Sequence, residues 1–436
     1  MTITIIGHGY VGLVTAAVFA DLGNTVWVIG RDKNKIAKLK SGDPLFYEPG
    51  LSEMMRRNLN AGRLKFTLEY TDAISSSSVI FIGVGTPPKE DGSADLSNVL
   101  TVAESIGNHI KNYVVVACKS TVPVGTNQRI KDIILKKCKV ASRKFDVASC
   151  PEFLREGSAL SDTLHPDRVV IGTENKKAQE VLLEFHEPID GERVLTTIES
   201  AEMIKYASNS LLATKISFAN MIAFLCDKVG ADVEQVLQGV GLDHRLGRSF
   251  LYPGVGYGGS CLPKDVNALI KTGEQYGESM DLLKEVERIN QQSRERLVGK
   301  VSTLLNKSKT NKTVAILGLA FKPDTDDLRE APSLKVISSL LVKYPDIRIQ
   351  VFDPIVKQHN HPLFKNVIYS NDPYKAATKA DVLIILTEWN EFRKLNLEKV
   401  KKLMRGSHII DGRNIYEPNA VKKLGFSYQG VGRSYL

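Results

Sequence analysis

Short apolar runs alternate with longer stretches of helical period along the first part of the chain. The runs are continuously apolar, which predicts strands buried on both faces, as in a parallel sheet. The stretches between them carry apolar residues on one side, which is typical of helices packed on such a sheet. The predicted strands are Thr2–Ile6, Thr25–Ile29, Ser78–Val84 and Val114–Cys118, and the predicted helices are Val11–Leu22 and Lys33–Ser41. This order predicts a doubly wound sheet.

The same pattern returns near the C-terminus. Strands are predicted at Thr313–Gly318, Arg348–Phe352 and Asp381–Leu386, in the same order as in the first part. The chain therefore has two nucleotide-binding-like halves. The second half reads Gly318-Leu-Ala-Phe-Lys322 and lacks a third glycine. We expect that it does not hold a dinucleotide as the first half does.

A helical region separates the halves. Apolar residues at helical spacing predict a long helix over Ser200–Val229 and another over Met280–Leu305. The polar segment Lys307–Lys312 reads as a linker. The fold class is thus α/β, with two Rossmann-like doubly wound domains, 1–198 and 307–436, joined by a central helical domain, 199–306. A long helix of this kind forms either a subunit interface, which would make the protein a homodimer, or an internal core helix.

Composition narrows the class of protein. The 436 residues include 43% apolar and 25% charged residues, which is typical of a globular protein, and no apolar run predicts a membrane span. Five cysteines without a CxxC pair argue against a disulfide framework or a metal site and favour the reducing cytoplasm. The net charge of +9 comes from dispersed lysines without interleaved aromatics. We therefore expect anionic small ligands rather than nucleic acid.

The segment Gly258-Gly-Ser-Cys-Leu-Pro-Lys-Asp265 carries the most informative chemistry. Cys261 follows flexible glycines, and Lys264 lies three residues away. A nearby cation and backbone N–H groups would favour the thiolate, which attacks carbonyl carbon. The alternative is a buried structural cysteine in a glycine-rich turn.

A glycine motif, Gly7-His-Gly-Tyr-Val-Gly12, follows the first strand and precedes a helix. In that context it predicts a dinucleotide site, with the pyrophosphate at the helix N-terminus. The second strand should end in an acidic residue that binds the adenosine ribose, but here Gly30 and Arg31 stand there. Alternatively, Asp32 turns back to the ribose hydroxyls, and Lys35 is close enough in the sequence to help bind either ribose form. The choice between NAD and NADP therefore stays open.

Three further segments carry polar side chains at informative places. Ser120 and Thr121 follow a predicted strand and should lie at the carboxyl edge of the sheet, where ligands bind. Glu152 and Glu156 are four residues apart and would share one face of a helix. Lys205 and Asn209 have the same spacing on the long helix. By themselves such pairs are more often solvated than catalytic.

Together these motifs resemble the nucleotide-sugar dehydrogenases, the UDP-glucose/GDP-mannose dehydrogenase family, over nearly the whole chain. The glycine-cysteine motif and Arg245-Leu-Gly247 look most like the branch that oxidises UDP-glucose. The matching segments are Gly7–Gly12, Tyr47–Leu51, Gly85–Pro87, Lys119–Gly125, Pro151–Gly157, Glu202–Asn209, Phe250–Asp265, Phe321–Ser333 and Asp411–Asn414.

The resemblance implies a role for each matching residue. The implied catalytic residues are Cys261 as nucleophile, Lys205 and Asn209 at the sugar oxygen, Asp265, Thr121 and Glu156 toward water, and Glu152 as acid–base. The implied cofactor-binding residues are Gly7, Gly9, Tyr10, Val11, Gly12, Gly30, Arg31, Lys35, Gly85, Thr86, Ser120, Thr121, Glu156, Lys264 and Arg329. The implied substrate-binding residues are Glu152, Phe153, Leu154, Lys205, Asn209, Arg245, Phe250, Leu251, Tyr252, Gly254, Gly258, Phe321, Lys322 and Arg413.

The implied reaction oxidises UDP-glucose to UDP-glucuronic acid in two hydride transfers to NAD, through a thiohemiacetal and a thioester on Cys261. The alternatives are a UDP-N-acetylhexosamine as the substrate, or a two-electron hydroxyacid or sugar-phosphate dehydrogenase. A non-catalytic nucleotide-sugar binder would not need Cys261, Lys205, Asn209 and Asp265 together. Cys150 and Leu262 depart from the family pattern, as do Gly30 and Arg31, which leave NADP open.

Overall fold

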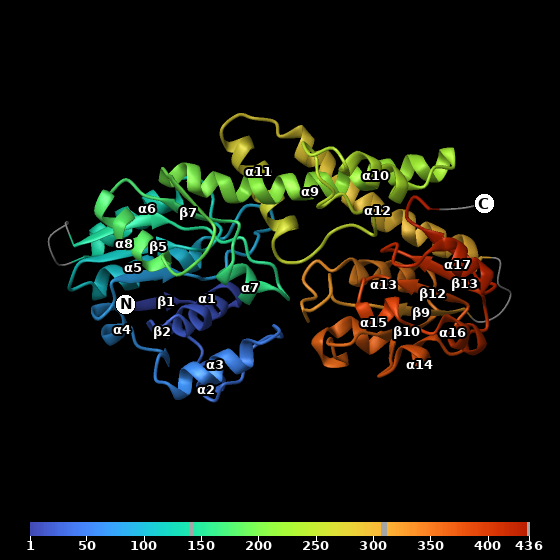
Figure 1. Cartoon of the computed structure of the whole chain (residues 1–436), viewed down its shortest axis with the longest axis horizontal. Helices are drawn as coiled ribbons and strands as arrows, with labels where there is room; N and C mark the ends of the chain where they lie inside the picture. Colours follow the sequence, from blue (N-terminus) through green and yellow to red (C-terminus); the bar gives the residue numbers. More distant parts are fainter. Residues whose placement is uncertain (139–143, 307–311, 434–436) are drawn as a thin grey trace. The chain divides into compact units, whose positions relative to one another are not determined.

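A computed structural model describes residues 1–138, 144–306 and 312–433, and it divides the chain into two compact units (Figure 1). Unit 1 comprises Met1–Ser208 and Asn267–Glu278. Unit 2 comprises Asn209–Val266 and Ser279–Leu436. The predicted linker falls largely on residues 307–311, outside the described residues. The division into three domains at 198 and 306 stays an expectation.

Unit 1 is built on an eight-stranded sheet with the order β3-β2-β1-β4-β5-β6-β7-β8. Neighbouring strands are parallel except β6 and β7, which are antiparallel. The strands are β1 (Thr2–Ile6), β2 (Thr25–Ile29), β3 (Leu64–Thr67), β4 (Val79–Ile82), β5 (Val114–Cys118), β6 (Phe145–Ser149), β7 (Arg168–Gly172) and β8 (Glu192–Thr196). The strand order reverses between β1 and β4, and ligands of such sheets bind at this reversal.

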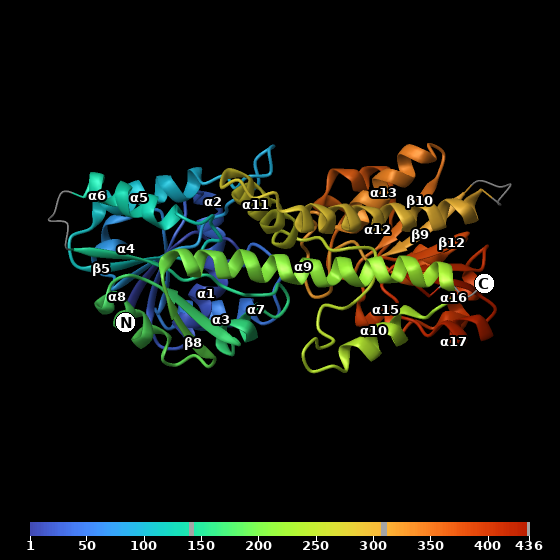
Figure 2. The same cartoon turned by 90° about the horizontal axis from the view of Figure 1, so that it is seen from above.

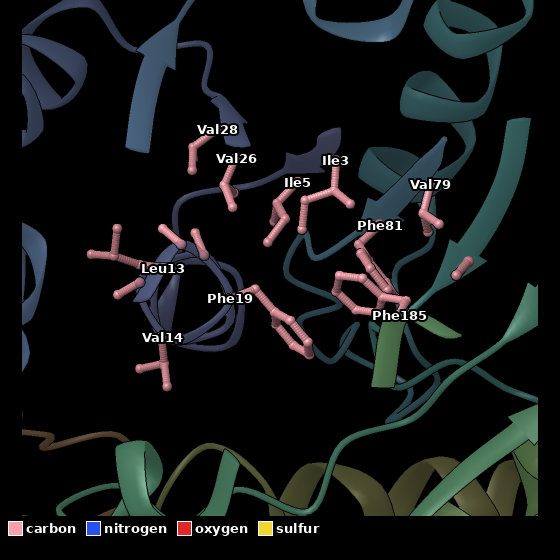
Figure 3. Close-up of a cluster of buried hydrophobic side chains, with 14 of the residues drawn as sticks. Ile3, Ile5, Leu13, Val14, Phe19, Val26, Val28, Val79, Phe81 and Phe185 are labelled. Carbon is pink, nitrogen blue, oxygen red and sulfur yellow. The ribbon is translucent and has the colours of Figure 1, made fainter. Parts of the chain in front are cut away.

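Helices cover both faces of this sheet. They are α1 (Tyr10–Asp21), α2 (Lys33–Lys40), α3 (Leu51–Asn60), α4 (Thr71–Ser75), α5 (Ser97–His109), α6 (Thr126–Lys137), α7 (Ala159–Leu164) and α8 (Lys176–His186). On one face α1 and α8 pack through Phe19 and Phe185, whose rings stack 4.0 Å apart beside Phe81 of β4 (Figure 3). This packing holds the glycine motif, which starts α1, at the edge of the sheet.

Unit 2 is built on a six-stranded parallel sheet with the order β11-β10-β9-β12-β13-β14. Its strands are β9 (Thr313–Leu317), β10 (Arg348–Phe352), β11 (Ile368–Tyr369), β12 (Val382–Ile385), β13 (His408–Asp411) and β14 (Ser427–Gly430). Its helices are α10 (Val233–Gly241), α12 (Asp281–Leu305), α13 (Pro332–Lys343), α14 (Pro373–Ala377), α15 (Asn390–Arg393), α16 (Leu397–Leu403) and α17 (Pro418–Lys423), with short 3₁₀ turns at Gln358–Asn360 and Pro362–Asn366. The predicted α/β class with two doubly wound sheets is confirmed.

Two helices carry residues of both units. The predicted long helix is α9 (Ile198–Val229), 32 residues in one unbroken helix (Figure 2). The shorter α11 (Leu262–Gln275) follows Cys261. Within the described part of the chain, α9 is the one helix that meets the length and composition needed to cross a membrane. It carries buried Glu202, Lys205 and Asn209, so it is a packed helix with polar partners.

Candidate functional site

The glycine motif forms a cradle at the start of α1. Gly7 has φ +118°, and a Cβ there would lie 2.4 Å from the Gly83 carbonyl oxygen. A Cβ on Gly12 would lie 2.2 Å from the Gly7 oxygen, so both positions require glycine. Gly9 precedes α1, and nothing lies within 4 Å of where its Cβ would be. No side chain caps the first N–H groups of α1, which include those of Tyr10 and Val11, so this end of the helix suits a pyrophosphate.

The loops after β4 and β5 meet at the same edge of the sheet, as predicted. Thr86 Oγ1 donates to the Thr121 carbonyl oxygen (2.9 Å), and Ser120 Oγ donates to the Val84 oxygen (2.6 Å). Nothing lies within 4 Å of a Cβ built on Gly85. The loop that holds Gly85 and Thr86 is thus bonded to the loop that holds Ser120 and Thr121.

At the end of β2, the structure assigns a different role to each polar residue. Arg31 is exposed, and its Nη1 donates to Asn98 Oδ1 (3.0 Å). Asp32 accepts from the backbone N–H groups of Asn34 and Lys35 and so caps α2. Lys35 is exposed in the first turn of α2.

In unit 2 the equivalent turn is closed by a side chain. Asp353, at the end of β10, accepts from the N–H groups of Leu319 (2.8 Å) and Ala320 (3.1 Å). These are amides of the turn after β9, where a dinucleotide phosphate would bind in the first half. The Asp353 carboxylate thus takes the place of a phosphate at these amides. This gives a physical reason for the expectation that the second half does not hold a dinucleotide as the first half does.

Glu152, Phe153, Leu154 and Glu156 lie in a loop after β6, so the expectation of a shared helix face is wrong. The Glu152 carboxylate accepts from the Leu154 N–H (2.6 Å), which holds the backbone in a turn. Its other oxygen lies 3.4 Å from Lys205 Nζ, and the two side chains are only 7% and 5% exposed. In such a buried pair each charge compensates the other.

Phe153 packs beside this pair. The Arg168 guanidinium lies 3.7 Å from the centre of its ring, and Lys205 Nζ lies 5.1 Å from it. The ring therefore covers the Lys205 ammonium group on one side.

Glu48 is a residue that spacing alone did not single out, although its motif belongs to the family resemblance. Its carboxylate accepts from Gly157 N–H (2.6 Å) and Ala159 N–H (2.7 Å), and the Tyr10 hydroxyl bonds to it as well. Burial, followed by the Glu48 contact, raises the pKa of Tyr10. The Tyr10 side chain therefore ties the first turn of α1 to the loop that carries Glu156.

Glu202 is a second residue that spacing alone did not single out, although it begins a segment of the family resemblance. From α9 it accepts three hydrogen bonds at the start of α6, from Gly125 N–H (2.7 Å), Asn127 N–H (2.9 Å) and Asn127 Nδ2 (2.7 Å). Burial raises the pKa of Glu202 against the effect of these donors. Because no side chain of its own segment caps α6, Glu202 acts as its N-terminal cap and fixes the loop of Ser120 and Thr121.

Replacing Glu202 with alanine should destabilise the protein by about 2–4 kcal/mol, because buried donors at the start of α6 lose their acceptor. Glu202→Gln keeps one acceptor oxygen and should cost less. Urea unfolding measures both, with Glu199→Ala, an exposed carboxylate of the same helix, as the control. Equal stability of Glu202→Ala and Glu199→Ala would contradict the capping role.

Cys261 lies at the N-terminus of α11 and is exposed, whereas Cys118, Cys150 and Cys226 are buried. The Asp265 N–H donates to the Cys261 carbonyl oxygen (2.9 Å), which is the first bond of this helix. The sulfur lies 3.7 Å from Ser260 Oγ. The positive end of the helix dipole stabilises an anion at this position. The alternative of a buried structural cysteine is therefore wrong.

Asp265, one turn into α11, is buried and doubly bound. Asn209 Nδ2 of α9 donates to its Oδ2 (2.6 Å), and Lys264 Nζ pairs with its Oδ1. Asn209 and Lys205 lie one turn apart on α9. The amide and the carboxylate therefore form a fixed polar pair at the start of the cysteine helix.

The loop from Phe250 to Gly259 is held by hydrogen bonds from several elements of unit 2. Gly254 N–H donates to Asn220 Oδ1 (2.8 Å), and Gly259 N–H donates to the Arg329 oxygen (2.9 Å). The Asn290 amide bonds both backbone groups of Tyr257, at 2.8 and 3.2 Å. Leu251 is buried, whereas Tyr252 is exposed under the Arg248 guanidinium. The loop is therefore a rigid support for Cys261.

Arg413 holds this loop against the sheet of unit 2. Its guanidinium donates to the carbonyl oxygens of Gly256 (3.2 Å), Phe321 (3.2 Å) and Leu386 (2.9 Å), and it pairs with Glu388 (3.2 Å). Lys322 Nζ lies 5.8 Å from the centre of the Phe321 ring.

Two other predicted arginines are paired with near neighbours in the sequence. Arg329 pairs with Asp327 (2.7 Å), and Arg245 pairs with Asp243 (2.5 Å), both at the surface.

The predicted residues thus fall into two groups. Unit 1 holds the glycine cradle, Thr121, the Glu152 loop and Lys205. Unit 2 holds Asn209, the 250–259 loop, Cys261 and Asp265. The structure brings the members of each group together, while their roles stay predictions.

Comparisons with known proteins agree with this arrangement. Residues 1–190, 199–292 and 315–418 match the NAD binding, central and UDP binding domains of the UDP-glucose/GDP-mannose dehydrogenase family. The chain is 45% identical to a UDP-glucose 6-dehydrogenase of Pseudomonas aeruginosa, over 99% of this chain and 98% of that protein. It is 44% identical to the UDP-glucose 6-dehydrogenase TuaD of Bacillus subtilis, over 99% and 93%.

Two solved structures show the same fold. A UDP-glucose dehydrogenase from Pyrobaculum islandicum superposes with a TM-score of 0.90 at 38% identity, covering 99% of this chain and 97% of that one. A UDP-D-ManNAc dehydrogenase from Pyrococcus horikoshii gives 0.88 at 29%, covering all of both chains. The chain is a member of the UDP-glucose/GDP-mannose dehydrogenase family.

Proposed function

We propose that this protein is a UDP-glucose 6-dehydrogenase, which oxidises UDP-glucose to UDP-glucuronic acid. The observation that carries the proposal is the exposed Cys261 at the N-terminus of α11, beside the buried pair of Asn209 and Asp265. A two-electron dehydrogenase or a simple binding protein has no use for such a thiol. The match to the NAD binding domain, with the open cradle at Gly9, supports NAD as cofactor.

The first oxidation takes the C6 alcohol to an aldehyde. Bound NAD supplies the hydride acceptor for each of the two oxidations. Lys205, held against Glu152 in a buried site, stabilises negative charge on the sugar oxygen and assists its proton transfer. The Cys261 thiolate then adds to the aldehyde carbon, and the resulting thiohemiacetal oxygen is held by the Asn209 amide.

Loss of the second hydride from the thiohemiacetal leaves a thioester on Cys261. Water attacks the thioester carbon, releases the carboxylate and returns the thiol. Asp265 positions or activates this water, and Thr121 and Glu156 orient it. Glu152 acts as the acid–base that takes up and returns the proton of the water. The covalent bond keeps the aldehyde from leaving between the two oxidations.

The build of the 250–259 loop favours glucose over an N-acetylhexosamine. A Cβ on Gly258 would lie 2.3 Å from the Glu330 oxygen, and one on Gly259 would lie 2.7 Å from the Phe321 ring. Because the loop already packs this closely on its support, it cannot withdraw to admit an acetamido group. The similarity to a UDP-D-ManNAc dehydrogenase keeps the acetamido sugar as the second candidate.

Counting reduced cofactor tests the proposal. We expect two NADH per UDP-glucose consumed, and kcat/KM at least about tenfold higher for UDP-glucose than for UDP-N-acetylglucosamine or UDP-N-acetylmannosamine. One NADH per sugar would overturn the four-electron mechanism. A higher kcat/KM for an acetamido sugar would overturn only the substrate assignment.

We further propose that the protein is a homodimer that buries one face of α9. Leu211, Phe218, Met221, Leu225 and Val229 are exposed on this helix at helical spacing, and Leu225 is 59% exposed. Exposed apolar stripes of this length mark interaction surfaces. A second copy of the chain is the natural occupant, since a twofold axis pairs such a stripe with itself. The five free cysteines fit a cytoplasmic protein.

Introducing charge on this stripe should separate the dimer. Leu225→Glu is expected to halve the mass measured by light scattering, because burying the new carboxylate against an apolar face is unfavourable. Val342→Glu, on α13 and 81% exposed, is the matched control and should leave the mass unchanged. A monomeric parent protein would contradict the proposal.

A further inference from the structure

The His8 side chain occupies the space beside the end of β2 where an acidic residue would bind the adenosine ribose. A Cβ built on Gly30 would lie 2.4 Å from His8 Cδ2 and 2.7 Å from Ile36 Cδ1. Contacts this short do not occur, so no side chain fits at position 30 while His8 and Ile36 keep their places. Glycine at position 30 is therefore required by the positions of these two side chains.

The charges around this position are mostly positive. Arg31 and Lys35 are exposed, and the one nearby carboxylate, Asp32, is engaged in capping α2 at 2.9 and 3.0 Å. Burial, and after it the charges of Lys35 and Arg31, lower the pKa of His8, so its imidazole is neutral at pH 7. The one nearby carboxylate thus caps α2 through its Oδ1, and the exposed guanidinium can turn from Asn98 to a ligand.

We infer that the adenosine-ribose end of this cofactor site accepts a 2′-phosphate, with Arg31 as its counter-charge and His8 in the place of the acidic side chain. An acidic residue there would repel the phosphate and bind the free hydroxyls. A guanidinium instead binds phosphate through paired hydrogen bonds. The binding of a 2′-phosphate does not depend on the proposed dehydrogenase function. The consequence for catalysis does rest on that function, and it is that NADP supports turnover with kcat/KM within about tenfold of the value for NAD.

A binding measurement tests the inference without any sugar turnover. By calorimetry, 2′-phospho-ADP-ribose should bind no more than about tenfold more weakly than ADP-ribose. Arg31→Ala should weaken the phosphorylated ligand about tenfold or more and change ADP-ribose less than about twofold. Lys40→Ala, which removes the same charge at the far end of α2, should change neither. A parent protein that prefers ADP-ribose by more than tenfold would overturn the inference.

A double substitution tests the role of His8. Gly30→Asp alone should weaken both ligands, because its side chain collides with His8 and Ile36. His8→Ala removes the nearer obstacle and gives the end of the Ile36 side chain room to turn away. His8→Ala/Gly30→Asp should therefore recover ADP-ribose binding and reject the phosphorylated ligand by about 100-fold, whereas His8→Ala alone should keep the parent selectivity. Unchanged selectivity in the double variant would overturn the role of His8. If Gly30→Asp fails to fold, the surface variant Arg31→Ala still decides the phosphate site. Loss of sugar oxidation with intact ligand selectivity would count against the proposed function alone.

Discussion

Replacing Cys261 with alanine should abolish formation of UDP-glucuronic acid, by about 10⁴-fold or more, as expected when a nucleophile is lost. The reason is positional. Cys261 is exposed at a helix N-terminus, whereas three of the other cysteines are buried, and burial raises the pKa of Cys150 to about 12. A buried thiol of that kind stays protonated and cannot replace the nucleophile. Product chromatography after a long incubation measures the effect.

Two controls make this result specific. Cys138→Ala removes the other cysteine that is not buried and should keep full activity. The dissociation constant of Cys261→Ala for UDP-glucose should stay within about threefold of the parent value, because the 250–259 loop is held by Asn220, Asn290 and Arg413 rather than by the thiol. Normal uronic acid production by Cys261→Ala would rule out the thioester mechanism.

The central strands of both sheets were predictable because buried parallel strands appear in the sequence as continuous apolar runs. These are β1, β2, β4 and β5 in unit 1 and β9, β10 and β12 in unit 2, whereas the other strands were not predicted. The bounds of β1, β2, β5 and β10 agree with the predicted ones residue for residue. The glycine motif was equally informative. At Gly7 and Gly12 a side chain would collide with backbone atoms, which every turn of this kind brings close. Periodicity and close backbone packing are local properties, and a sequence shows them directly.

What the sequence could not show depends on contacts between distant segments. The Glu152–Glu156 segment has helical spacing of carboxylates, yet it turns because the Glu152 side chain bonds Leu154 N–H and reaches Lys205. Glu202 caps a helix 75 residues away from it in the sequence. His8 excludes a side chain at Gly30 only because β1 and β2 pair in parallel, which brings the ends of the two strands together. None of these follows from spacing within one segment.

Lys205→Ala should lower kcat by about 10²–10³-fold and leave KM for UDP-glucose within about threefold, because the lysine acts on charge that develops in the transition state. The structure complicates this simple experiment. Lys205 lies 3.4 Å from Glu152 in a buried site, so removing the cation leaves an unpaired carboxylate. Breaking a buried pair from one side costs about 3–5 kcal/mol of stability. Thermal unfolding must therefore accompany the kinetics.

The double variant Lys205→Ala/Glu152→Gln separates chemistry from stability. A neutral amide at position 152 no longer needs a cation, so the double variant should regain most of the stability that Lys205→Ala loses. Its kcat should nevertheless stay as low as that of the single variant. The other lysine that interacts with Glu152 is Lys119, which follows β5, and burial lowers the pKa of Lys119, so it is a poor substitute for the Lys205 cation. Glu152→Gln alone shows how much of the loss belongs to the carboxylate. Recovery of kcat together with stability would mean that Lys205 only neutralises Glu152, and a raised KM with unchanged kcat would mean that it only binds the sugar.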